Sequence, residues 1–241
     1  MQNETTHVTY TGRGIMGSHG FQVLQMSSRP RWELVEGYRG ISTPLISDNL
    51  NRIYGSTAHL RPLHRGAQLL GVALTVKTRP GDNLMVHKAL DLAQAGDVIV
   101  VDAGGDVTNA IVGEIMMTLA MHKGLRGFVV DGAIRDVRAF AEADFPVYAR
   151  GVTHRGPYKD GPGEINVPVS VCGMTVVPGS IIVGDADGVV AIPPDAAESV
   201  LRAAVSQRQR EQAILSDVVS GTVDRSWVDQ TLRQKGCSFD V

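Results

Sequence analysis

The feature that most constrains the fold is an alternation of apolar runs and helical patterns between residues 69 and 143. The runs over 98–101 and 127–130 are short, continuous and apolar, which is typical of strands that are covered on both faces. In chain order the pattern predicts a strand over 69–78, a helix over 83–93, a strand over 98–101, a helix over 109–122, a strand over 127–130 and a helix over 136–143. Strands that are joined by helices pair in parallel, so this region predicts an α/β core.

The segments on either side of this core have other patterns. Residues 1–30 contain several glycines, serines and threonines and are predicted to form an N-terminal arm, while residues 31–241 are predicted to form one α/β domain. Two short helices are expected between 31 and 53. Beyond Pro146 the pattern predicts short strands over 147–149, 165–171, 174–177, 180–183 and 188–192, and then helices over 195–215 and 225–234.

Composition excludes several classes of protein. Of the 241 residues, 43% are hydrophobic and 20% are charged, so the chain is not expected to be disordered. A net charge of −2 argues against direct nucleic-acid binding. No apolar run approaches the roughly 18 residues that a membrane span requires, and no secretion signal is recognisable at the N-terminus. Two cysteines are too few for a disulfide scaffold, so we expect a cytoplasmic protein with no membrane partner.

Three common functional motifs are absent or out of context. Gly12, Gly14 and Gly17 have the spacing of a dinucleotide-binding fingerprint, but no strand precedes them and no clean helix follows, so they are interpreted as part of the arm. The seven histidines are scattered and no Cys/His set has zinc spacing. No Gly-x-Ser-x-Gly stretch is present, which excludes the simplest hydrolase.

Two segments that follow buried strands carry the candidate chemistry. Arg135 and Asp136 lie where a helix begins after the strand over 127–130, and ligands of open α/β sheets bind at the carboxyl ends of the strands. Aspartate is a hard ligand for Mg²⁺ or Mn²⁺, and arginine offers a planar fork to a carboxylate or an enolate. The alternative is that Asp136 caps the helix and pairs with Arg135 at the surface. Gly113 and Glu114 similarly begin either an anion-binding turn or an ordinary connection.

Taken together, these segments resemble the family of 4-hydroxy-4-methyl-2-oxoglutarate aldolases and of the regulator of ribonuclease E activity A. The resemblance is carried by the Gly113-Glu114 pair and, after a spacer, by Gly132-Ala133-Ile134-Arg135-Asp136. Gly-Glu-Ile-Asn-Val-Pro-Val over 163–169 and the segment over 178–189 also match, and the similarity extends over residues 40–220. It implies an α/β/β/α sandwich of the swivelling-domain type, with an N-terminal extension and C-terminal helices, assembled as a homotrimer or homohexamer with active sites between subunits.

The resemblance also implies roles for particular residues. Asp136 would bind a divalent metal cation, Mg²⁺ or Mn²⁺, and Arg135 would contact the substrate and stabilise a pyruvate enolate. The Glu114 side chain would hold a metal-bound or proton-carrying water. Glu211 would reach the site from the long helix of a neighbouring subunit. The pyruvyl carboxylate would be bound by the backbone of Gly113, Glu114, Ile115 and Met116.

The function implied is that of a metal-dependent, class II aldolase. Such an enzyme cleaves a 4-hydroxy-2-oxo dicarboxylic acid, such as 4-hydroxy-4-methyl-2-oxoglutarate, to pyruvate and needs no Schiff-base lysine. Because decarboxylation of oxaloacetate gives the same enolate, one site serves both reactions. Two alternatives remain open: a non-catalytic, protein-binding regulator of ribonuclease E-type activity, and a related lyase for another hydroxy acid. The loop over 150–163 is either a lid or an ordinary exposed loop.

Overall fold

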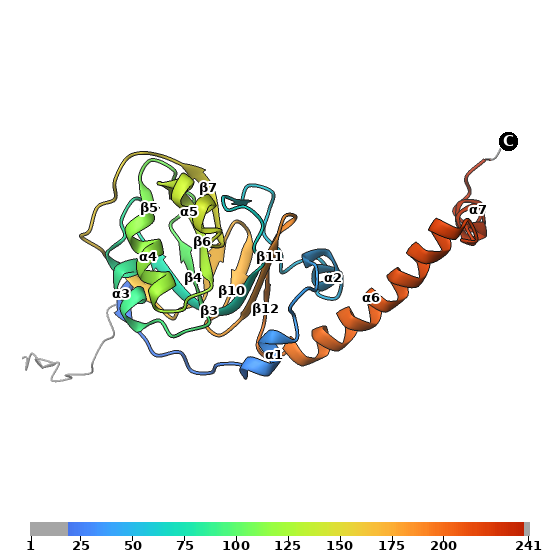
Figure 1. Ribbon diagram of the computed structural model, residues 1–241, viewed down its shortest axis with the longest axis horizontal. Coiled ribbons are helices and arrows are strands. Elements are labelled where there is room, and N and C mark those ends of the chain that lie inside the picture. Colours follow the sequence, from blue (N-terminus) through green and yellow to red (C-terminus); the bar gives the residue numbers. More distant parts are fainter. Residues whose placement is uncertain (1–18, 239–241) are drawn as a thin grey trace, which may run out of the picture.

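The computed structural model describes residues 19–238 (Figure 1). Its helices are α1 (Trp32–Glu36), α2 (Thr43–Asp48), α3 (Leu84–Leu92), α4 (Glu114–His122), α5 (Val137–Ala143), α6 (Ala197–Ser220) and α7 (Ser226–Gln234). Its strands are β1 (Phe21–Val23), β2 (Arg61–Pro62), β3 (Leu69–Thr78), β4 (Asp97–Asp102), β5 (Ala110–Val112), β6 (Gly127–Ile134), β7 (Val147–Val152), β8 (Gly163–Ile165), β9 (Val169–Val171), β10 (Met174–Val176), β11 (Ile181–Asp185) and β12 (Gly188–Ile192).

The central sheet has the parallel core that the alternation predicts. Its strand order is β1-β8-β3-β4-β6-β7-β2, and β3, β4, β6 and β7 are parallel neighbours. The carboxyl ends of these strands therefore meet at one edge of the sheet. The short strand β5 pairs with the end of β6 at that edge, with Val112 opposite Ile134.

Three hydrophobic clusters separate four layers, which confirms the expected α/β/β/α sandwich. One cluster lies between the central sheet and α3, α4 and α5. A second lies between the strands of the parallel core and a second β layer of β9 to β12, which is joined to that core where β11 pairs with β3. A third packs α1, α2 and α6 on the far side (Figure 1). Alternation along β4 assigns Ile99 and Val101 to the first cluster and Val98 and Val100 to the second, because successive side chains of a strand point to opposite faces.

Two of the helix boundaries predicted from the sequence are wrong. The helix expected over 109–122 begins only at Glu114, because Ala110–Val112 forms β5 beside β6. A short apolar run has no periodicity that distinguishes a strand from a helix, so only the pairing partner decides. The last long helix continues to Ser220, beyond the expected end at 215.

The described end of the N-terminal arm packs against the domain. β1 pairs in parallel with β8, and Arg29 forms an ion pair with Asp97, whose side chain is fully buried. Residues 1–18, including the glycine motif at 12–17, lie outside the described residues. None of the helices in residues 19–238 combines the length and the apolar character needed to cross a bilayer.

Candidate active site

The pairing of β5 with β6 brings the starts of α4 and α5 together. The Arg135 N–H donates to the Val112 carbonyl oxygen at 3.0 Å. The Glu114 N–H donates to Asp136 Oδ2, also at 3.0 Å, and Arg135 Nε lies 3.7 Å from the same carboxylate oxygen. The structure thus joins the two sequence segments that were expected to form one site.

Gly113 leaves just enough room for this junction. Its backbone is extended, with φ −154°, so it is not needed for an unusual conformation. A Cβ atom at this position would, however, lie 2.5 Å from Asp136 Oδ2 and 3.0 Å from Arg135 Cγ. Any side chain here would displace the carboxylate or the arginine.

Asp136 is oriented toward α4 rather than toward its own helix. It occupies the N-cap position of α5 in the left-handed region, with φ 57°, and makes no side-chain capping hydrogen bond there. Left-handed backbone is uncommon for a residue other than glycine, although aspartate tolerates it better than most. Of the alternative given above, the capping of α5 by Asp136 is therefore not observed, whereas its pairing with Arg135 at the surface is. Its side chain is 42% exposed and remains accessible to a ligand.

The first turn of α4 has backbone donors available. Of its N–H groups, that of Glu114 is bound by Asp136, and that of Met117 donates to the Gly113 carbonyl. The N–H groups of Ile115 and Met116 donate to no acceptor within residues 19–238. These two donors, at the positive end of the helix, are thus the ones left to bind an anion.

A pocket of about 100 Å³ opens beside this turn and contains several residues that the sequence reasoning missed. Asn83 directly precedes α3 and His87 lies on it, while Pro157 and Lys159 come from the loop between β7 and β8. The sequence signal that could have identified Asn83 is its position in the connection that follows β3. Polar residues in such connections lie at the edge of the sheet where the parallel strands have their carboxyl ends. The complete lining is Asn83, His87, Ala110, Ile111, Val112, Gly113, Ile115, Met116, Arg135, Pro157 and Lys159.

Two of the missed residues interact electrostatically. Burial lowers the pKa of His87, and the nearby Lys159 ammonium group lowers it further. His87 is therefore neutral at neutral pH, and the fixed positive charges on the pocket wall belong to Arg135 and Lys159.

The loop that carries Lys159 is hydrogen-bonded on both sides of the pocket. On one side, Asn109 Nδ2 donates to the Gly156 carbonyl at 2.6 Å. On the other, the buried Asp82 carboxylate accepts the N–H groups of Asp160 and Gly161, at 2.7 and 3.0 Å. The loop was expected to be either a lid or an ordinary exposed loop, and these contacts instead hold it as part of the pocket wall.

The donor set fits a metal held mainly by substrate and water. Residues 19–238 contain no group of three or more His, Cys, Asp or Glu side chains that could hold a metal ion. At the junction, Asp136 Oδ2 accepts the Glu114 N–H, whereas Asp136 Oδ1 takes part in none of the hydrogen bonds of the described residues. Mg²⁺ commonly binds through one or two carboxylates and keeps several waters, so one free carboxylate oxygen is compatible with such a site.

Glu211 does not join the site within one chain. It lies on the exposed second half of α6, where its Oε1 accepts a hydrogen bond from Gln207. Figure 1 shows α6 leading away from the body, on the side opposite α4 and α5. A role for Glu211 at the site therefore requires a second copy of the chain.

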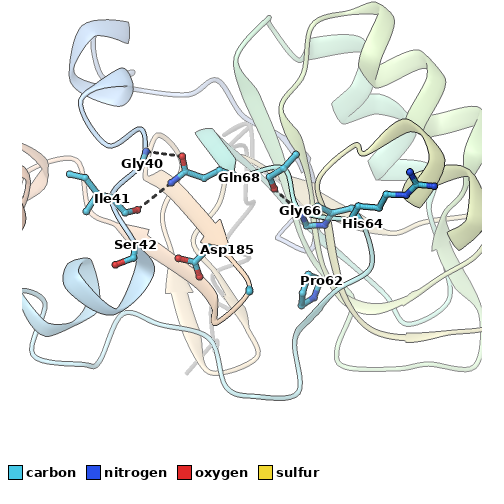
Figure 2. Close-up of a pocket in the computed structure, with 11 residues that line it drawn as sticks. Gly40, Ile41, Ser42, Pro62, His64, Gly66, Gln68 and Asp185 are labelled. Carbon is cyan, nitrogen blue, oxygen red and sulfur yellow. Dashed lines mark hydrogen bonds between the residues drawn. The ribbon is translucent and has the colours of Figure 1, made fainter. Parts of the chain in front are cut away.

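A separate cavity of about 370 Å³ between α2, β2 and the β11–β12 turn is less suited to chemistry (Figure 2). Several of its polar side chains already bind the protein itself. Gln68 bridges the Gly40 N–H and the Ile41 carbonyl, and the Asp185 carboxylate accepts the N–H and hydroxyl of Thr43. These contacts show that the Gln68 and Asp185 side chains connect the surrounding segments of the fold.

Comparisons with known proteins agree with the fold. Residues 43–191 match the family model for RraA-like proteins, described as Aldolase/RraA. A protein of Halalkalibacterium halodurans, provisionally named a 4-hydroxy-4-methyl-2-oxoglutarate aldolase, is 44% identical over 80% of this chain and 94% of its own length. A 4-hydroxy-4-methyl-2-oxoglutarate aldolase of Thermus thermophilus is 39% identical over 46% of this chain and 68% of its own length.

A solved structure is similar as well. It is that of RraAS2 from Streptomyces coelicolor, described as an unusual member of the RNase ES inhibitor RraA protein family. Its TM-score is 0.70 at 28% identity, and the match covers 77% of this chain and 96% of that one. The relatives thus include proteins named as aldolases and a protein named for inhibition of a ribonuclease.

Proposed function

Because this chain belongs to the RraA-like, or Aldolase/RraA, family, we propose that it is a lyase that cleaves a 4-hydroxy-2-oxo dicarboxylic acid to pyruvate. The substrate that we favour is 4-hydroxy-4-methyl-2-oxoglutarate, with oxaloacetate decarboxylation as a second activity. The observation that carries this proposal is the junction of Asp136, Arg135 and the first turn of α4 beside a small pocket. A protein that only binds a partner has no need of this arrangement.

The reaction places a specific demand on the site. The proton of the 4-hydroxyl group leaves, the bond between C3 and C4 breaks, and its electron pair passes to the fragment with the 2-oxo group. That fragment forms as pyruvate enolate and is then protonated at C3, while the C4 fragment becomes a second oxo acid. The developing negative charge on the enolate oxygen must be stabilised by groups that are already in place.

The residues at the junction have matching roles. The free N–H groups of Ile115 and Met116 would bind the pyruvyl carboxylate at the positive end of α4. Arg135, held beside Gly113, would place its guanidinium against the enolate oxygen. Glu114 begins α4 with an exposed side chain and would hold the water that exchanges the hydroxyl proton.

Asp136 would hold the cation. Its carboxylate is held at the junction through Oδ2 and has a free, accessible Oδ1, so we propose that it binds Mg²⁺ or Mn²⁺. When bound, such an ion supplies Lewis-acid stabilisation of charge on the 2-oxo and carboxylate oxygens. Gly113 and the Glu114 N–H keep the carboxylate in place for this purpose.

We also propose that the active unit is a homo-oligomer, a trimer or a hexamer, in which Glu211 reaches the site of a neighbouring copy. Only the first turns of α6 are buried, at Ala197, Val200 and Ala204, and residues 209–220 are exposed throughout. The exposed half carries large apolar side chains, including Val219 at 89% exposure. A projecting helix with such a surface is typical of a subunit contact.

The test is pyruvate release from 4-hydroxy-4-methyl-2-oxoglutarate and from oxaloacetate, with Mg²⁺ or Mn²⁺ and with chelator. We expect activity that chelator abolishes, total loss in Asp136→Ala, and a fall in kcat of about 10²–10³-fold in Arg135→Ala, the typical cost of one charge-stabilising donor. Arg138→Ala is the matched control, because Arg138 lies on α5 but pairs with Glu142 at the surface. Full activity in Asp136→Ala, or with chelator, would refute the mechanism.

The second candidate is inhibition of a ribonuclease E-type enzyme through protein binding. The similarity to the Streptomyces coelicolor protein favours it. A pull-down with ribonuclease E, done beside the pyruvate assay, separates the two. Binding without pyruvate release would support the regulator and overturn the lyase.

A further inference from the structure

We propose that Lys159 binds the second carboxylate of the substrate and so selects dicarboxylates over monocarboxylates. This inference rests on the proposed function, which accounts for only one of the two carboxylates. The first turn of α4 and Arg135 would receive the pyruvyl end. The remaining fixed positive charge on the pocket wall is the Lys159 ammonium group.

Lys159 lies close to Arg135 along the loop. A Cβ atom at Gly156 would be 3.4 Å from Arg135 Nη1, so the guanidinium packs against the loop backbone at that residue. Three residues of chain span at most about 10 Å, which keeps Lys159 near the same end of the pocket. Arg135 and Lys159 both line this pocket, so a ligand bound in it lies between walls that carry both cations.

The Lys159 ammonium group is free to bind a ligand. Within residues 19–238 it forms no salt bridge and no hydrogen bond, and its side chain is exposed at the pocket. Two other lysines are engaged: Lys123 Nζ donates to the Asp91 carbonyl at 2.9 Å, and Lys88 Nζ lies 4.0 Å from the Asp91 carboxylate. The Lys159 charge lies near enough to His87 to contribute to the lowering of the pKa of that imidazole.

The backbone around Lys159 is held in register with α3. The Tyr158 N–H donates to the Gly81 carbonyl at 2.8 Å, and the Asn83 N–H donates to the Tyr158 carbonyl at 3.0 Å. The Asp82 carboxylate binds the two residues that follow Lys159. Asp82 is thus a positioning residue. Because it holds the backbone of the loop, the Cα atom of Lys159 is fixed, and the ammonium group can reach only the space within one side-chain length of that atom.

The experiment measures binding of two compounds that differ only at the distal end. 2-Oxoglutarate has a carboxylate there, 2-oxopentanoate has a methyl group, and neither has the 4-hydroxyl that cleavage requires. Dissociation constants are measured by calorimetry with Mg²⁺ present, for the wild type, Lys159→Gln and the control Lys88→Gln. We expect the wild type and the control to prefer 2-oxoglutarate by about tenfold or more, equivalent to about 1.4 kcal/mol, and Lys159→Gln to lose that preference.

The outcomes separate this inference from the proposed function. Equal affinity of the wild type for the two compounds, a preference that persists in Lys159→Gln, or no binding of either compound would overturn the subsite. If the preference depends on Lys159 but the wild type releases no pyruvate from hydroxylated substrates, the subsite is supported and the lyase is refuted.

Discussion

At the residue scale, Gly113 has no side chain, and the space this leaves allows Asp136 and Arg135 to lie beside the start of α4. We expect Gly113→Ala to displace the carboxylate, because the new Cβ would lie 2.5 Å from Asp136 Oδ2. A displacement of this kind typically lowers kcat/KM by about 100-fold. The control is Gly66→Ala, since a Cβ atom at Gly66 would meet nothing within 4 Å. Steady-state pyruvate release measures both variants, and near-normal activity in Gly113→Ala would mean that the junction is not catalytic.

The same residues show how far the sequence can predict a site. Arg135 and Asp136 were identifiable because they follow a buried strand, where a parallel sheet presents its ligands. Their contact with Gly113 and Glu114 depends on β5, which was mistaken for the start of a helix. The pattern of a single segment does not reveal which strand it pairs with, so the contact could be inferred only through the family resemblance.

At the element scale, Asp82 connects α3 to the loop that carries Lys159. Burial alone would raise its pKa, but the N–H donors of Asp160, Leu84 and Gly161 outweigh burial and keep the pKa below its ordinary value. The charged form therefore stabilises the fold at pH values above the ordinary carboxylate pKa, and this contribution is lost as the pH falls through the lowered one.

We accordingly expect Asp82→Asn to be less stable than the wild type at neutral pH and to lose less stability in acid. The amide cannot accept hydrogen bonds from all three N–H groups as the carboxylate does. Urea unfolding between neutral pH and about pH 3, below the ordinary aspartate pKa, measures the free energy of unfolding. Asp91→Asn, at an exposed position of α3, is the control. Parallel pH profiles for Asp82→Asn and the wild type would contradict this account.

Elements differ in how well local sequence determines them. β3 was predicted at its full length because its alternation and flanking turns agree. The sequence left open whether the loop over 150–163 is a lid or an ordinary exposed loop, because its hydrogen-bond partners, Gly81, Asp82 and Asn109, lie far away in the chain. Such long-range hydrogen bonds produce no hydrophobic periodicity in the sequence of either segment, so they cannot be predicted from it.

At the scale of the whole molecule, the second half of α6 and most of α7 are not covered by any other part of residues 19–238. Ile214, Leu215, Val218 and Trp227 are all more than half exposed. Helices in proteins owe most of their stability to packing of an apolar face, so this part is expected to be ordered by a neighbouring copy. A chain that ends at residue 206 should therefore keep the four-layer fold but sediment as a monomer. A truncated chain that still assembles would place the subunit contact elsewhere.

If Glu211 acts on a neighbouring copy, two inactive variants should restore activity when they are mixed. Asp136→Ala and Glu211→Gln are each expected to be inactive alone, because every site lacks one group. After the subunits are dissociated and reassembled in equal amounts, a site receives an intact Asp136 from one variant and an intact Glu211 from the other. Random assembly of a ring with sites between subunits makes about one quarter of the sites complete. Pyruvate release near that fraction of the wild-type rate would support the shared site, and no recovery in verified mixed oligomers would exclude it.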